Sequence, residues 1–263
     1  MKLERQIVRV GNSAGVVLPK EWLNGRARIE LVEKPLDIRK DILQIIESYL
    51  EDVIGIYLVG SYARREQTRE SDVDVLVISG KTAKTVVFGK YEIVISPLFS
   101  VLSVLKEHPE MIFPKIIDAK AIMNKDLLEE LRNIKLSEAS FDRYFRDSKK
   151  MITMNKEHIE LDRGAGDNLK SCAVIYSVLL RLRALFMIRC ILQKRKYSNK
   201  NFQEWIIGKI GIDRKEYEKI YEAYRAIRDN KKSKVKIKLF VAEKLLGLLE
   251  KEIGKHGKKK KET

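Results

Sequence analysis

Apolar residues in the first half of the chain gather in short runs separated by turns, a pattern typical of strands. Runs at 53–59, 73–78 and 91–95 have the length and β-branched content of buried strands, and 116–123 is a candidate fourth. Before them, residues 37–51 place isoleucines three or four positions apart, which predicts an amphipathic helix. The segment therefore predicts a small mixed sheet with helices, an α+β fold.

The second half is helical in pattern almost to its end. The stretch 171–192 is the most apolar, but Arg181, Arg183 and Arg189 interrupt it. An arginine at a bilayer centre costs at least about 2.5 kcal/mol, so we predict a buried helix there and not a membrane span. Helices are expected near 101–106, 126–132, 140–160, 168–194, 201–208, 213–229 and 236–253.

These patterns divide the chain into four parts. Residues 1–35 read as a β-hairpin segment around a Gly-Asn turn, too short to bury a core alone, so we expect it to dimerise. Residues 36–125 form the α+β domain, and 126–254 form a C-terminal helical bundle. The low-complexity tail, 255–263, is expected to be disordered.

Charge is concentrated in the helical half. The net charge is +16, of which residues 126–263 supply +14 while residues 37–125 carry −1. A basic surface attracts polyanions, so a nucleic acid or an acidic protein is a natural partner, although a solvated surface would look the same.

Cysteine and histidine usage argues against disulfides and zinc. Cys172 and Cys190 both lie in an apolar helical stretch, and none of the three histidines lies close to another His or Cys. The composition favours a reducing, cytoplasmic location.

The candidate chemistry lies in residues 58–79, LVGSYARREQTRESDVDVLVIS. Gly60 and Ser61 follow a buried strand and open a short helix, where backbone amides and a hydroxyl can bind phosphate. Asp72 and Asp74 are two residues apart on the next strand, so both carboxylates project from the same face. Carboxylates beside a phosphate cradle suit Mg²⁺, or Mn²⁺, holding a nucleoside triphosphate such as ATP.

Glu92 is the candidate third acid. It is the only acidic residue in the third predicted strand, and no apolar core explains it there. It would serve as a metal ligand or accept the proton of an attacking hydroxyl, although an exposed strand glutamate needs no function. Arg64 is a candidate for steadying phosphate charge, and a surface salt bridge is an equal alternative.

The combined motif resembles the DNA polymerase β-type minimal nucleotidyltransferases over about residues 37–125. The resemblance implies that Gly60 and Ser61 contact the triphosphate, that Asp72 and Asp74 bind metal, and that Glu92 completes the acid set. Small members usually have glycine at the position of Arg65, so the loop near the phosphates is expected to differ.

The flanking segments carry weaker resemblances. Residues 3–34 are similar to SpoVT-AbrB/MazE-like swapped hairpins, which implies an intertwined homodimer that binds DNA through Arg5, Arg9 and Lys20. Dimerisation without DNA binding remains open. The helical half loosely resembles HEPN-like bundles but lacks their Arg–His pair, so we expect no ribonuclease activity.

We therefore expect a nucleotidyltransferase that moves a nucleoside monophosphate, AMP from ATP in the simplest case, to a hydroxyl acceptor. An acidic partner protein is the expected acceptor, slightly ahead of RNA, in an enzyme of antitoxin type. The alternative is a DNA-binding regulator or antitoxin whose transferase fold binds nucleotide without catalysis.

Overall fold

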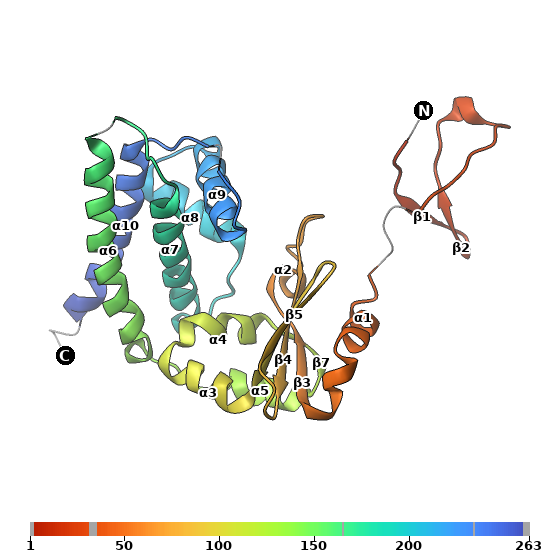
Figure 1. Ribbon diagram of the computed structural model, residues 1–263, viewed down its shortest axis with the longest axis horizontal. Helices are drawn as coiled ribbons and strands as arrows, with labels where there is room; N and C mark the ends of the chain where they lie inside the picture. The colour runs from red at the N-terminus through yellow and green to blue at the C-terminus, as the bar shows by residue number, and fades with distance from the viewer. Residues whose placement is uncertain (1–2, 32–35, 165, 234, 260–263) are drawn as a thin grey trace. The chain divides into compact units, whose positions relative to one another are not determined.

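The computed structural model describes residues 3–31, 36–164, 166–233 and 235–259. The chain divides into two compact units, Met1–Asp41 and Ile42–Thr263, and each is described by itself (Figure 1). The domain boundary expected at residue 35 lies outside the described residues.

The first unit contains a β-hairpin. Strands β1 (Ile7–Val10) and β2 (Ser13–Val16) pair antiparallel, and Gly11 supplies the positive φ, +57°, at the turn. A single 3₁₀ turn, η1 (Lys20–Trp22), follows. No residue within 3–31 is buried, and Leu23 is 70% exposed. Residues 3–31 therefore have no apolar core of their own.

The second unit is built on a five-stranded mixed sheet, in the order β5-β6-β4-β3-β7. Only β4 and β6 pair parallel; the other neighbours are antiparallel. The expected α+β mixed-sheet class is confirmed. The strands are β3 (Val53–Leu58), β4 (Val73–Ser79), β5 (Lys84–Phe88), β6 (Tyr91–Pro97) and β7 (Lys120–Met123).

Three helices pack on the sheet face that carries Leu76 and Ile78 of β4. Phe113 and Ile116 of one helix and Leu128 of another join the same apolar cluster. Side chains two apart on a strand share a face, so Asp74 points to this helix-covered side. The helices are α3 (Leu98–Glu107), α4 (Pro109–Asp118) and α5 (Lys125–Arg132); α1 (Ile38–Ile45), η2 (Glu47–Asp52) and α2 (Gly60–Arg64) precede them.

The strand expected at 116–123 is wrong in its first half. Ile116–Asp118 end helix α4, and only Lys120–Met123 form a strand. The helix starts with Pro109, a residue suited to the first helical turn, but it also contains Pro114. An internal proline normally ends a helix, which is why the sequence pattern pointed elsewhere.

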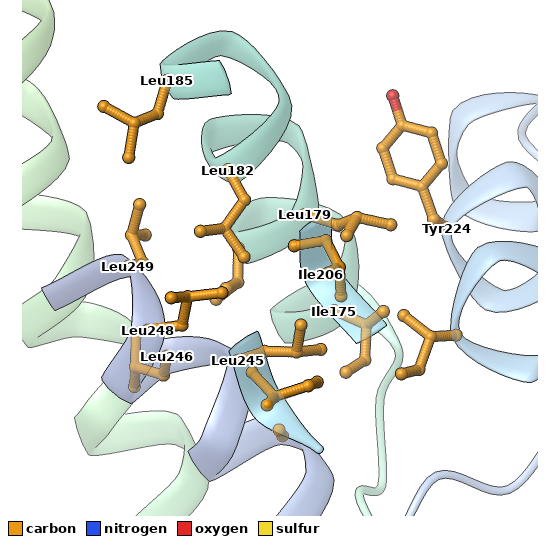
Figure 2. Close-up of a cluster of buried hydrophobic side chains, with 14 of the residues drawn as sticks. Ile175, Leu179, Leu182, Leu185, Ile206, Tyr224, Leu245, Leu246, Leu248 and Leu249 are labelled. Atoms are coloured by element: carbon orange, nitrogen blue, oxygen red, sulfur yellow. The ribbon is translucent and has the colours of Figure 1, made fainter. Parts of the chain in front are cut away.

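The helical region packs around α7. Ile175, Leu179 and Leu182 of this helix are buried, and Figure 2 shows them beside Ile206 of α8 and leucines of α10 such as Leu245. Helices α6, α7 and α10 lie side by side (Figure 1). The elements are η3 (Glu138–Phe141), α6 (Asp142–Arg163), α7 (Ala173–Leu192), α8 (Asn199–Ile210), α9 (Arg214–Arg228) and α10 (Leu239–Lys259).

Helix ends follow the sequence signals. The side chains of Ser198 and Asp213 accept hydrogen bonds from the backbone of Asn201 and Glu216, and so cap α8 and α9. Helix α10 continues to Lys259, into the segment expected to be disordered, and residues 260–263 lie outside the described residues. Across the described ranges, no helix combines the length and apolarity that crossing a bilayer requires.

The packing of α10 predicts a stability effect. Leu249 is fully buried, so Leu249→Ala should lower the free energy of unfolding by about 2–5 kcal/mol through lost burial and a cavity. Leu161→Ala on α6, where the side chain is 73% exposed, is the matched control and should change it by less than about 0.5 kcal/mol. Urea unfolding of both variants measures this, and equal losses would contradict the assigned packing.

Candidate active site

Gly60 lies directly against the carboxylate of Asp74. Its φ is +68°, and a Cβ built there would come within 2.0 Å of Asp74 Oδ2 and 2.9 Å of its Cγ. The preceding residue is tied to the same strand, because Val59 N donates to Asp74 O at 2.9 Å. Only glycine fits here, and the start of α2 is therefore held beside the acid.

Asp74 also lies next to Glu92. The two are direct register partners on the parallel strands β4 and β6, and Asp72 precedes Asp74 by two residues. Asp74 is half-buried, whereas Asp72 and Glu92 are exposed. Burial raises the pKa of Asp74, and the negative charges of Glu92 and Asp72 raise it further. The site thus concentrates negative charge at one end of the strands.

Two cations act in the opposite direction on Asp74. Lys115 and Arg64 both lower its pKa by electrostatic attraction. Lys115 is exposed and comes from α4, the helix that the sequence pattern did not reveal. Pro109 is a signal for a helix start, and the spacing of Phe113 and Ile116 on such a helix places Lys115 off its core-facing side.

The donor chemistry of this site suits a hard divalent cation. Carboxylate oxygens are the ligands Mg²⁺ prefers, and the backbone at the start of α2 lies directly beside the carboxylate of Asp74. The described residues contain no group of three or more His, Cys, Asp or Glu side chains that could hold a metal ion. Asp74 and Glu92 are brought together on neighbouring strands, but Asp72, Asp74 and Glu92 do not converge as a group of three.

Arg64 makes protein contacts. Its Nε donates to Glu66 Oε2 at 2.9 Å and its Nη1 to Asp118 Oδ2 at 3.4 Å. Its guanidinium also lies over the ring of Tyr197, 5.5 Å from the centroid, and the side chain is 13% exposed. The predicted role of Arg64 in nucleotide binding remains a prediction; its observed contacts join three segments of the fold.

Glu66 carries this connection into the helical region. Its carboxylate accepts hydrogen bonds from Asn199 N at 3.1 Å and Asn199 Nδ2 at 3.0 Å, at the start of α8. Farther along the same loop, Arg225 of α9 pairs with Glu70 at 3.0 Å. The sequence places Glu66 next to the motif but gives no sign of a partner so far along the chain.

Arg65 occupies a position that favours glycine. It ends α2 in the left-handed conformation, with a φ of +61°. A side chain there costs about 1–2 kcal/mol relative to a right-handed conformation. The left-handed backbone thus explains why small transferases usually have glycine at this position.

The predicted DNA-binding residues lie in the first unit. Arg5, Arg9 and Lys20 are all exposed, and Arg9 Nε donates to Gly11 O at 2.9 Å across the hairpin turn. Exposure leaves them accessible to a partner.

Comparison with known proteins finds a family match over the region that carries the site. Residues 39–156 match the nucleotidyltransferase domain family. No curated protein matches the chain. One similar solved structure is a spectinomycin adenyltransferase from Enterococcus faecialis, crystallised with ATP and spectinomycin. It is 12% identical to this chain with a TM-score of 0.47, and the match covers 82% of this chain and 97% of that one. Another is a nucleotidyltransferase-like protein from Exiguobacterium sibiricum, 15% identical with a TM-score of 0.32. That match covers 83% of this chain and 75% of the other. Gly60, Asp74 and Glu92 lie within the matched residues.

The contact between Gly60 and Asp74 predicts a difference between two glycines. Gly211→Ala meets only backbone strain, since Gly211 has a φ of +63° and open space, and should cost about 1–2 kcal/mol of unfolding free energy. Gly60→Ala should cost about 1–3 kcal/mol more, because the new methyl overlaps Asp74. Denaturant unfolding compares them, and equal costs would show that Asp74 does not pack against Gly60.

Proposed function

We propose that residues 36–125 form a nucleotidyltransferase domain that moves AMP from ATP to a hydroxyl acceptor. The family match supports nucleotidyl transfer in general. The observation that carries the finer proposal is the position of Gly60, whose bare backbone lies against Asp74 while Asp74 faces Glu92 across β4 and β6. Backbone amides at a helix start can bind a phosphate, and carboxylates beside it suit a bound cation.

Each residue has a part in the reaction. Gly60 and Ser61 bind the triphosphate through backbone amides and the serine hydroxyl. The acceptor oxygen forms a bond to the α-phosphorus, the bond to the bridging oxygen breaks, and pyrophosphate leaves. Glu92, which is exposed beside Asp74, accepts the proton of the attacking hydroxyl.

Asp72, Asp74 and Glu92 would hold Mg²⁺ or Mn²⁺. Bound there, the metal supplies positive charge for the phosphate oxygens and the attacking oxygen. Lys115 adds a second source of positive charge near Asp74. The negative charge around Asp74 is unfavourable in the metal-free protein. Its role is then to bind the cation that neutralises it.

Asp74→Asn separates catalysis from folding. Transfer of labelled AMP from ATP to proteins or RNA of a cell lysate, with Mg²⁺ present, should fall at least about 100-fold, since several kcal/mol of metal assistance are lost. Burial raises the pKa of Asp74, so its charged form opposes folding at neutral pH, and the amide should leave the metal-free protein at least as stable.

Glu130→Gln provides the control, because it removes an exposed charge from α5 outside the site. It should transfer like the parent protein. Full metal-dependent transfer by Asp74→Asn would contradict the assignment. Nucleotide binding with no transfer by the parent protein would favour the alternative, a DNA-binding regulator.

The first unit is proposed to dimerise the protein and to present Arg5, Arg9 and Lys20 to DNA. The support is its lack of any buried residue within 3–31, together with exposed apolar side chains such as Val17, which is 68% exposed. Apolar strands of this kind need a second copy to bury them.

Light scattering tests this assembly. The full chain should have twice the mass of the 30.5 kDa protomer at micromolar concentration, and a chain beginning at Leu36 should be a monomer. A monomeric full-length protein would refute the proposal.

A further inference from the structure

A cavity of about 750 Å³ lies between the loop after α2 and helices α7, α8 and α9. Glu66 and Thr68 line it from the loop after α2. The helices contribute Arg183 of α7, Phe202 of α8 and Tyr221 of α9. The size falls within the range of about 300–1,000 Å³ typical of ligand sites. The transfer chemistry proposed above does not use it.

Arg183 offers free donors to this cavity. Its Nε donates to Tyr197 Oη at 3.0 Å, and Tyr197 Oη in turn donates to Asn199 Oδ1 at 2.8 Å. These contacts fix the guanidinium plane. Within the described part of the chain, its Nη1 and Nη2 have no hydrogen bond or ion pair. A half-buried guanidinium with two unused nitrogens is suited to a planar or tetrahedral anion.

Tyrosine rings form one wall beside that guanidinium. Tyr217 and Tyr221 of α9 line the cavity with ring centroids 6.0 Å apart and planes 12° from parallel, and the buried Tyr224 stacks against Tyr221 at 5.8 Å. The phenol groups of Tyr221 and Tyr224 lie within electrostatic reach of Arg183. The wall therefore combines aromatic faces with hydroxyl donors.

Three of the four acidic residues of the lining have polar partners, and Glu222 is the exception within the described residues. Glu66 accepts from Asn199, Glu218 pairs with Arg214 at 3.5 Å, and Asp229 pairs with Arg228 at 2.7 Å. Lys231 and Lys232 add two cations at the rim. The guanidinium of Arg183 thus keeps its attraction for an anion.

We propose that this cavity binds a nucleotide unit of the acceptor, with its phosphate on Arg183 and its base against Tyr217 and Tyr221. Arginine forks bind phosphate, and bases stack on aromatic rings. Taking the ligand as the acceptor rests on the proposed function. Arg64 connects the two places, because it lies over Tyr197 and acts on Asp74.

Calorimetry without divalent cations tests the site with three probes: AMP, adenosine and tetra-adenylate RNA. AMP and the RNA should bind, and adenosine should bind at least about tenfold more weakly, because it lacks the phosphate. RNA binding more tightly than AMP identifies a strand end as the source, and equal binding identifies a free nucleotide.

Matched variants assign the binding to the cavity. Arg183→Gln should weaken AMP binding at least about tenfold, and Tyr221→Phe, which keeps the ring, about threefold through the lost hydroxyl. Arg146→Gln removes the same charge from an exposed site on α6 and should have no effect. Should Arg183→Gln fail to fold, Tyr221→Phe still decides.

Two results would overturn the inference: unchanged AMP binding by Arg183→Gln and Tyr221→Phe, or equal weakening by Arg146→Gln. Asp74→Asn separates this inference from the proposed function. AMP binding that depends on Arg183 and survives Asp74→Asn supports the cavity even if no transfer is detected. Transfer that depends on Asp74 with no AMP binding at Arg183 supports only the proposed function.

Discussion

The ion pairs of Arg64 are the constraint on which the site geometry depends. A guanidinium that is 13% exposed needs partners, and Glu66 and Asp118 provide them from the motif loop and from the end of α4. Burial keeps the pKa of Asp118 raised even though Arg64 lowers it, so the pairing is costly to form and costlier to break. Through Glu66 and Asn199 the same charges hold α8 against the sheet domain.

Local backbone strain surrounds this pairing. Helix α2 has five residues, and it begins at Gly60 and is followed by Arg65, both with positive φ. A single turn of helix bracketed in this way has little stability of its own, so its direction is set by Asp74 on one side and by Arg64 on the other. The positive φ values at Gly60 and Arg65 thus accompany the placement of the Gly60 backbone beside a carboxylate.

Sequence patterns predicted the parts of the fold that depend on neighbours along the chain. Strands β3, β4 and β6 were visible as apolar runs, whereas Asp72, which we expected on the same strand as Asp74, directly precedes β4. Strand β5 was not visible, because its residues are mostly exposed at the sheet edge and do not form an apolar run. Glu66 with Asn199, and Arg183 with Tyr197, are contacts set by tertiary packing, which no local period reports.

The pairing of α6 with α10 has a consequence for synthesis of the chain. Arg163 at the end of α6 bonds to Glu243, and Lys156 to Glu250, so α6 finds these partners only when the last helix is made. At about 5–20 residues per second, the ribosome needs roughly 5–20 s to travel from the end of α6 to the end of α10. During that interval the apolar faces of α6 and α7 lack their cover, while the sheet domain has already been completed. The nascent protein thus has a period in which a chaperone or a second nascent chain can bind the apolar faces of α6 and α7 before α10 covers them.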